Sequence, residues 1–313
     1  MLPTKKDLQD CYDRMQPFVH RTPVLTSSLL NEESGSSLFF KCENFQKGGA
    51  FKMRGAVNAI LQLTEKQKAK GVVTHSSGNF AQAVSLAAKS IGIKAYIVIP
   101  DNAPKVKVDA VKSYGGIITT AASTIESREE TAALIQKETG ATFLHPSNNL
   151  DVILGQGTAA IELLEEEHDL DMILTPVGGG GLITGTSLAA YYFGKNCNVI
   201  GGEPANMDDA YRSLKSGKIE VNESGVTIAD GLRTTLGDIN FPIIQELVSD
   251  IIRVEEDEII RTMRLIWERM KIVVEPSSAV AFATVLKEKN RFKNKKIGIV
   301  LSGGNVDVSA LPF

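Results

Sequence analysis

One lysine lies in a setting that could support covalent chemistry. Lys52 occurs in the segment GGAFKMRGA, residues 48–56, where small residues surround it and Phe51 precedes it. A lysine amine is a nucleophile only in its neutral form, which a partly dry pocket favours. A solvated lysine early in a helix is the ordinary alternative for any single lysine, so the chemical interpretation depends on partners elsewhere in the chain.

Four consecutive glycines form the strongest local motif. In ILTPVGGGGLITGTSLAAYYF an apolar strand leads into Gly178, Gly179, Gly180 and Gly181, and a helical pattern follows. Glycines let backbone N–H groups converge, and a helix N-terminus adds positive potential, so the segment predicts a phosphate-binding loop. A tight turn is the alternative, but it needs only one or two glycines. The motif matches neither G-x-x-x-x-G-K-[ST] nor G-x-G-x-x-G, which disfavours nucleoside triphosphates and dinucleotides.

Two further polar segments directly follow apolar strands. IVLSGGNVD, residues 299–307, places Ser302 after one strand, and THSSGNFAQA, residues 74–83, places Ser77 and Asn79 after another. Ligands of open parallel sheets bind outside the carboxyl ends of the strands, so these side chains are candidates for the same site. The alternative for Ser77 or Asn79 is capping of the helix that follows.

The elements that must position these residues alternate along the chain. Apolar segments of strand length are separated by segments with helical spacing of apolar residues, which predicts parallel sheet covered by helices. The expected strands cover residues 37–43, 71–76, 95–100, 116–120, 142–146, 171–177, 198–203, 251–255 and 296–302.

Composition excludes several classes of protein. The 313 residues are 43% hydrophobic and 23% charged, which is typical of globular proteins. A net charge of -3 argues against nucleic acid as a partner, and the apolar segments are too short to span a membrane. The N-terminal segment has no apolar core of a signal peptide, and the three scattered cysteines form no C-x-x-C motif. We therefore expect a cytoplasmic protein with neither a nucleic-acid nor a membrane partner.

The motifs together resemble a known family. KCENFQKGGAFKMRGA, SSGN, GQGT, GGGG and LSGGN occur in the order and spacing of the fold-type II pyridoxal phosphate enzymes, and within them of the serine racemases and serine/threonine dehydratases. The resemblance extends from RTPVLTSS to SGGNVD, nearly the whole chain. It implies an α/β fold like that of the tryptophan synthase β subunit, with two open, twisted, mostly parallel sheets flanked by helices. It also implies a homodimer, in which residues 1–66 and 147–313 form a large cofactor-binding domain and residues 67–146 a small mobile one.

The resemblance assigns cofactor roles to residues in these motifs. Lys52 binds the aldehyde of pyridoxal 5'-phosphate covalently, next to Phe51, and Gly178–Gly181 bind its phosphate. Asn79 bonds the ring hydroxyl, and Ser302 the pyridine nitrogen. A neutral hydroxyl there makes the ring a weaker electron sink than an acidic partner would, which favours α-proton exchange and β-elimination. Glu275 lies near the cofactor or is a buried structural acid.

Substrate residues follow from the same resemblance. The substrate carboxylate meets Ser76, Ser77 and Asn79, with Arg128 as a further partner. Ser77 serves the face of the α-carbon opposite Lys52, where related threonine dehydratases often have alanine. The resemblance thus implies a serine racemase with L-serine and L-threonine dehydratase activity, which forms pyruvate or 2-oxobutanoate and ammonia. The alternatives are a threonine or threo-3-hydroxyaspartate ammonia-lyase that does not racemise, and a non-catalytic regulatory protein that binds a phosphate ligand.

Two further ligands are implied by the family. In GGEPANMDDAYRS, Glu203, the Met207 carbonyl and Asp209 occupy the positions that bind Mg²⁺ (or Ca²⁺ or Mn²⁺), whereas spacing alone would favour acidic residues that cap a helix. An ATP site at the subunit interface is implied, without support from a nucleotide motif. Its residues would be Ser27, Ser28, Lys47, Gln82, Tyr114, Lys271 and Asn305.

The chain departs from the family pattern at two positions. Ala50 stands where the family usually has serine, and Phe80 stands where it usually has histidine. Phe80 removes a polar side chain near the substrate, which disfavours an acidic substrate such as hydroxyaspartate.

Overall fold

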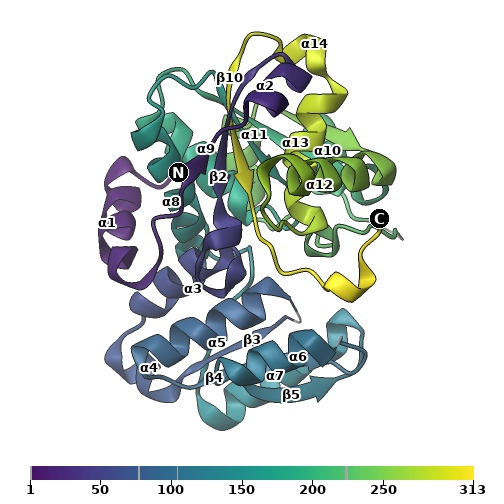
Figure 1. Cartoon of the computed structure of the whole chain (residues 1–313). Coiled ribbons are helices and arrows are strands. Elements are labelled where there is room, and N and C mark those ends of the chain that lie inside the picture. The colour runs from purple at the N-terminus through teal and green to yellow at the C-terminus, as the bar shows by residue number, and fades with distance from the viewer. Residues whose placement is uncertain (1, 77, 104, 223–224) are drawn as a thin grey trace.

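The computed structural model describes residues 2–76, 78–103, 105–222 and 225–313 (Figure 1). Strands and helices alternate along most of these residues. The strands are β1 (Val24–Leu25), β2 (Ser37–Cys42), β3 (Val72–His75), β4 (Ala95–Pro100), β5 (Ile117–Ala121), β6 (Thr142–Phe143), β7 (Met172–Pro176), β8 (Asn198–Pro204), β9 (Asp250–Val254) and β10 (Lys296–Leu301). The helices are α1 (Lys5–Met15), α2 (Ser28–Ser34), α3 (Lys52–Leu61), α4 (Glu65–Lys70), α5 (Asn79–Ile91), α6 (Lys105–Ser113), α7 (Ile125–Thr139), α8 (Leu150–Glu166), α9 (Gly181–Phe193), α10 (Asp209–Ser216), α11 (Asn240–Leu247), α12 (Glu256–Met270), α13 (Pro276–Lys287) and α14 (Lys289–Phe292).

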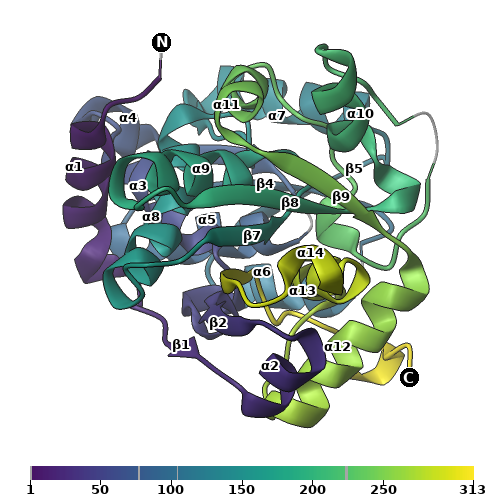
Figure 2. The ribbon, with the colours of Figure 1, turned by 90° about the horizontal axis from the view of Figure 1, so that it is seen from above.

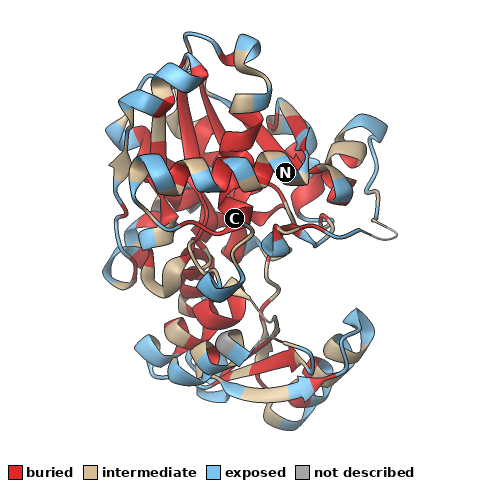
Figure 3. Cartoon of the chain, turned by 45° about the vertical axis from the view of Figure 1, so that its right-hand side comes forward, coloured by how far each residue is buried: buried red, intermediate tan, exposed pale blue. Residues whose placement is uncertain are grey.

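The larger sheet has six strands in the order β1-β2-β10-β7-β8-β9. Every neighbouring pair is parallel except β1 and β2. Helices cover both faces: α8 and α9 lie on one side, and α13 with α12 behind it lies on the other (Figure 2). Strands covered on both faces are apolar along their whole length, which explains the continuous apolar segments in the sequence. The resulting core is the buried layer between helices and sheet in Figure 3.

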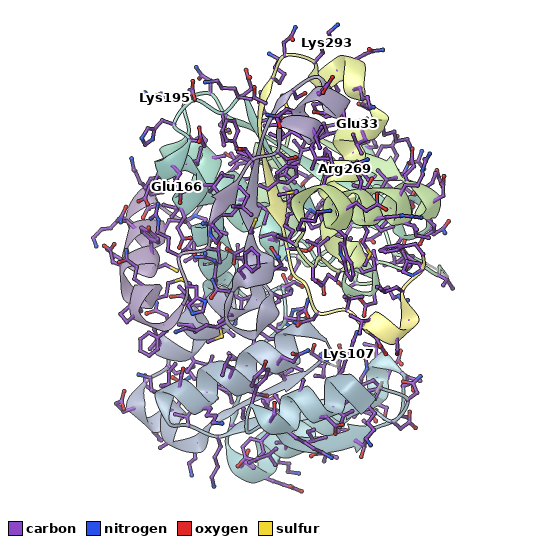
Figure 4. All side chains as sticks on the ribbon, viewed as in Figure 1. Glu33, Lys107, Glu166, Lys195, Arg269 and Lys293 are labelled. Atoms are coloured by element: carbon purple, nitrogen blue, oxygen red, sulfur yellow. The ribbon has the colours of Figure 1, made fainter. Side chains whose placement is uncertain are left out.

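The smaller sheet has four parallel strands in the order β5-β4-β3-β6. It is the lower part of the molecule in Figure 1, where α5 and α7 pack against it. Its strands fall within residues 67–146, the range predicted for a small domain, whose boundaries stay a prediction. Contacts between this part and the rest include the packing of α5 against α3 and the ion pair of Lys107, labelled in Figure 4, with Asp230.

The predicted fold class, with two mostly parallel sheets flanked by helices, is confirmed. Each of the nine predicted strands is present. Strand β6 is shorter than residues 142–146 predicted, because Pro146 has no N–H and the chain turns at His145. Two-residue strand β1 carries no periodic pattern and was not expected. Within the described residues, each helix is too short or too polar to cross a lipid bilayer.

A buried cluster of four charged side chains fixes the start of α3. We call it the Arg54 cluster; it consists of Lys41, Glu43, Arg54 and Glu162, each at most 2% exposed. The Arg54 guanidinium donates to both carboxylate oxygens of Glu43 (2.8 and 2.8 Å) and of Glu162 (2.8 and 2.7 Å). Lys41 Nζ lies 2.7 Å from Glu162 Oε2. Two positive and two negative charges compensate one another, and paired geometry of this kind makes burial tolerable.

Candidate active site

Lys52 begins α3 and is partly buried in the interior. Its Nζ donates to the Pro146 carbonyl oxygen (2.8 Å) and lies 5.0 Å from the ring centroid of Phe51 and 5.7 Å from that of Phe80. Among the described residues, no carboxylate forms an ion pair with it. Burial lowers the pKa of Lys52 to about 8, although the charge of Glu275 acts in the opposite direction. A neutral, nucleophilic amine is therefore accessible near neutral pH.

The four glycines leave β7 and lead into α9, as the sequence predicts. Gly180 adopts a left-handed conformation (φ 83°) at the N-cap of α9, where it contributes no side-chain oxygen to the first N–H groups of the helix. A Cβ atom at Gly179 would lie 2.3 Å from Ser147 Oγ, so the loop needs glycine there for close approach. Free N–H groups at the start of a helix suit a phosphate.

Ser302 is buried directly after β10. Its carbonyl oxygen accepts a hydrogen bond from the Phe51 N–H (2.9 Å), which links it to the start of α3. Its hydroxyl lies 3.1 Å from that of Ser278. The group at this strand end is therefore a neutral hydroxyl held next to the residue that precedes Lys52.

Asn79 connects the two sheets at this site. It begins α5 in the four-stranded part, and its Nδ2 donates to Glu275 Oε1 (2.8 Å) in the six-stranded part. Asn305 Nδ2 donates to Asn79 Oδ1 (2.9 Å) and to the Gly48 carbonyl oxygen (2.8 Å). Burial raises the pKa of Glu275 to about 7. Glu275 thus holds the amide of Asn79 in place.

The proposed substrate residues are only partly described. Ser76 follows β3 and accepts a hydrogen bond at Oγ from the Gly78 N–H (3.4 Å). Arg128 lies on α7, where its Nε donates to the Thr124 carbonyl oxygen (3.1 Å). Burial, and then the charge of Arg128, lower the pKa of His75, the last residue of β3. Ser77, the expected acid/base residue, lies outside the described residues.

Two buried carboxylates lie near the carboxyl end of β8: Glu203 within the strand and Asp209 at the start of α10. Glu203 accepts backbone N–H bonds from Ala210 (2.9 Å) and Tyr211 (2.8 Å), and Asp209 accepts one from Leu236 (3.1 Å). Burial raises the pKa of both, that of Asp209 to about 6, and the charge of Asp209 raises that of Glu203 further. Met207 is buried between them in the sequence.

Among the described residues, no third acidic side chain joins this pair of carboxylates. Asp208 is bound instead to Arg212 (2.7 Å) and Arg253 (2.9 Å). In the described part of the chain, no three side chains of His, Cys, Asp or Glu cluster as metal ligands would. A cation at this position would depend on two carboxylates, a backbone carbonyl and water.

The residues predicted for ATP are spread over separate elements. Ser27 and Ser28 begin α2, Gln82 is buried in α5, and Lys271 follows α12. Lys47 donates to the Phe18 carbonyl oxygen (2.8 Å), and Tyr114 follows α6. Asn305 belongs to the group around Asn79 described above.

Several residues that complete the site were not expected from the sequence. The carbonyl oxygen of Pro146 accepts a hydrogen bond from the Lys52 amine, and Ser147 packs on Gly179. Asn240 Nδ2 donates to the carbonyl oxygens of Ser147 (3.2 Å) and Gly179 (2.9 Å). The strand-end argument that selected Ser302 applies equally to Ser147, which follows the predicted strand at 142–146. Asn240 lies within α11 and has no local signal in the sequence.

Comparison with known proteins agrees with this arrangement. The family described as pyridoxal-phosphate dependent enzymes matches residues 15–303. Serine racemase from Dictyostelium discoideum is 50% identical over 98% of this chain and 96% of its own length. The β-hydroxyaspartate dehydratase of Paracoccus denitrificans is 47% identical over 100% of this chain and 99% of its own. The structure of maize serine racemase superposes with a TM-score of 0.95, at 47% identity, over 97% of this chain and 94% of that one.

These matches define the class of protein. The chain belongs to the pyridoxal-phosphate dependent enzyme family, and its fold is that of the fold-type II members. Within that family, its relatives include racemases and ammonia-lyases that act on hydroxyamino acids, as their names state.

Proposed function

We propose that this enzyme racemises serine and also dehydrates L-serine and L-threonine. The observation that carries the proposal is the loop at Pro146–Ser147, which contacts the Lys52 amine on one side and the glycine loop on the other. The shared loop supports the proposal that the Lys52 amine and the glycine loop serve one site. Relatives named serine racemase, which are 50% and 52% identical over nearly the full length, support the choice of substrate.

The residues present fit pyridoxal phosphate. Lys52 would bind the aldehyde of the cofactor, the backbone N–H groups of Gly178–Gly181 its phosphate, and Ser302 its pyridine nitrogen. Asn79, held by Glu275, would bond the ring hydroxyl, with Phe51 beside it. The lowered pKa of Lys52 and the glycine at position 179, where a Cβ would collide with Ser147, are the features that favour this cofactor. When bound, the cofactor supplies the electron sink that acidifies the α-hydrogen of an attached amino acid.

The chain's own groups then move protons. Ser76, Ser77, Asn79 and Arg128 bind the substrate carboxylate, which orients the α-hydrogen toward Lys52. The Lys52 amine removes that proton, and Ser77 returns one to the opposite face, which inverts the centre. When the β-hydroxyl leaves instead, L-serine is converted to pyruvate and ammonia, and L-threonine to 2-oxobutanoate and ammonia. The neutral hydroxyl of Ser302 favours both outcomes over reactions that need a strongly protonated ring.

A second candidate is an ammonia-lyase without racemisation. The identity with the β-hydroxyaspartate dehydratase of Paracoccus denitrificans supports it. Against it stands the apolar Phe80, whose ring faces the Lys52 amine at 5.7 Å and offers no donor to a second carboxylate. Serine is therefore the preferred substrate.

We further propose Mg²⁺, with Ca²⁺ and Mn²⁺ as alternatives, at Glu203, Asp209 and the Met207 carbonyl. Two adjacent buried carboxylates with raised pKa values are stabilised by a hard cation. A homodimer in the cytoplasm, with ATP bound at the interface through residues that include Lys47 and Asn305, completes the proposal. Sedimentation with and without ATP tests the last part.

One experiment decides between the two activities. Purified enzyme is incubated with pyridoxal phosphate, Mg²⁺ and, separately, L-serine, L-threonine or L-threo-3-hydroxyaspartate, and D-amino acid and keto acid are both quantified. We expect D-serine and pyruvate from L-serine. Keto acid without D-serine would establish the ammonia-lyase alternative. Ser77→Ala should abolish D-serine formation, and unchanged racemisation in that variant would overturn the role of Ser77.

A further inference from the structure

The loop after β6 lies between the Lys52 amine and the glycine loop, and two of its peptide groups have unusual partners. The carbonyl oxygen of Pro146 accepts the hydrogen bond from Lys52 Nζ (2.8 Å). The carbonyl oxygen of Ser147 accepts one from Asn240 Nδ2 (3.2 Å), which also donates to the Gly179 carbonyl oxygen (2.9 Å). Two consecutive carbonyl oxygens thus bond Lys52 and Asn240, which in turn bonds the glycine loop.

The N–H groups of the same two peptides share one acceptor. The Ser147 N–H (3.2 Å) and the Asn148 N–H (2.8 Å) both donate to Nδ1 of His145. A peptide group is planar, so an acceptor that fixes its N–H also fixes the direction of its carbonyl oxygen. His145 Nδ1 therefore determines where the oxygens of Pro146 and Ser147 point.

From this geometry we propose that His145 is a positioning residue that aligns Lys52 with the phosphate-binding glycine loop. The proposal rests on the cofactor site proposed above and concerns affinity for the cofactor, not the choice of substrate. His145 acts through two backbone peptides and needs no contact with the cofactor.

The surroundings of His145 keep its ring in the form that accepts these bonds. Groups that face it are His75 on β3, Lys52 on α3 and Asp238 in the loop before α11. Burial, and to a lesser extent the interactions with His75 and Lys52, lower the pKa of His145 to about 4, while Asp238 has the opposite effect. The imidazole is thus neutral at physiological pH, with Nδ1 unprotonated.

Asparagine is a matched replacement. Asn Oδ1 occupies nearly the position of His Nδ1 and accepts N–H bonds from residues two and three further along, as in an Asx turn. His145→Asn should therefore keep both bonds, whereas His145→Ala removes them. His168, whose Nδ1 lies 2.9 Å from the Leu164 carbonyl oxygen at the end of α8, provides the control variant His168→Ala.

The test is the affinity of the full-length protein for pyridoxal phosphate. Cofactor is removed, pyridoxal phosphate is titrated back, and the Kd is read from absorbance for the four proteins. Loss of two hydrogen bonds should weaken binding by about 10- to 100-fold in His145→Ala. His145→Asn and His168→Ala should stay within about threefold of the parent. Pyridoxal and inorganic phosphate, titrated separately, should both bind more weakly to His145→Ala, because pyridoxal reports on Lys52 and phosphate reports on the glycine loop.

Two results would overturn the proposal: an unchanged Kd in His145→Ala, or a Kd in His145→Asn as weak as in the alanine variant. If His145→Ala does not fold, His145→Gln replaces it, since its acceptor lies one bond too far for the same two N–H groups. Thermal unfolding of each variant separates a loss of stability from a loss of affinity. The parent protein must bind pyridoxal phosphate in the same titration, so failure of the cofactor site and failure of the role of His145 give different results.

Discussion

Lys41 and Lys52 are close in the sequence, but Lys41 is buried beside a carboxylate, whereas the described partners of Lys52 are uncharged. Lys41 is completely buried, 2.7 Å from Glu162 and bonded to the Thr22 carbonyl oxygen (2.6 Å), within the charge-balanced Arg54 cluster. Lys52 has a neutral carbonyl oxygen and two aromatic rings as its partners. A charge that is buried with its counter-charge is structural, and one that is buried without it has a lowered pKa and can react.

The acidic pair at Glu203 and Asp209 extends the comparison to negative charge. These carboxylates are as buried as those of the Arg54 cluster, but among the described residues neither forms an ion pair. Burial raises the pKa of both, although the charge of Arg212 partly offsets this at Asp209. Glu43, by contrast, has its pKa lowered by Arg54 and Lys41 despite complete burial. Within the described part of the chain, charged groups buried without an ion-pair partner thus occur both at Lys52, where we propose pyridoxal phosphate, and at Glu203 and Asp209, where we propose a metal ion.

The largest effect should come from Lys52→Ala. Without the covalent anchor and general base, kcat/KM for L-serine should fall by at least about 10³-fold in both racemisation and dehydration. The free energy of unfolding should change by less than about 1 kcal/mol, because no ion pair is broken. Coupled assays and urea unfolding measure the two. Residual activity within tenfold of the parent would remove Lys52 from the mechanism.

The opposite pattern is expected for Arg54→Met. This change leaves Glu43 and Glu162 without their shared cation and should lower the free energy of unfolding by about 3–5 kcal/mol. Arg264→Met is the matched control, because the exposed pair of Arg264 with Glu268 is worth less than about 1 kcal/mol. Equal unfolding midpoints in denaturant for the two variants would show that the Arg54 cluster is not a stabilising network.

A cation should stabilise the acidic pair. Mg²⁺ at a hundred times its Kd should raise the free energy of unfolding by about 2.7 kcal/mol, and chelation should reverse the gain. Glu203→Gln should abolish this response, whereas Asp208→Asn, which changes the neighbouring ion-paired carboxylate, should retain most of it. Melting curves with Mg²⁺ and with chelator test this. A parent protein indifferent to both would remove the metal site.

The smallest effect concerns Phe80, one of the two aromatic rings next to the Lys52 amine. Phe80→His adds a donor near the substrate, which should shift the ratio of kcat/KM for threo-3-hydroxyaspartate over L-serine upward by about tenfold. Phe80→Leu keeps this side chain apolar and should leave the ratio within about twofold. Parallel keto acid assays measure both substrates. A ratio unchanged by histidine would mean that Phe80 does not select the substrate.

The sequence pattern predicted nine of the strands and their parallel arrangement, because parallel strands buried on both faces are apolar throughout. The division into two sheets came from the resemblance to a family. The sequence pattern could not separate Lys41 from Lys52 by residue type. Their partners Glu162 and Pro146 are distant in the chain and meet them only after folding. The resemblance to a family, carried by the motif around Lys52, supplied the distinction that spacing alone did not.

The role of His145 escaped sequence reasoning for a different reason. Histidine after a strand indicates no particular partner, and the two N–H groups that it accepts belong to a turn whose shape depends on Asn240 and Gly179. The metal position shows the same limit, since acidic spacing fits a helix cap as well as a ligand pair. The burial of both carboxylates, which only the fold reveals, favours a ligand pair over a helix cap.

The contrast between the two lysines can be tested directly by chemical mapping. Protein freed of cofactor is mixed with pyridoxal phosphate between pH 6 and pH 11, reduced with borohydride, digested and analysed by mass spectrometry. Lys52 has a pKa lowered to about 8, so its neutral amine predominates above that pH and declines tenfold per unit below it. The account predicts one labelled peptide, at Lys52, with half-maximal labelling rate near pH 8. A label at Lys41 or another lysine, or a midpoint at the ordinary lysine value of about 10.4, would contradict it.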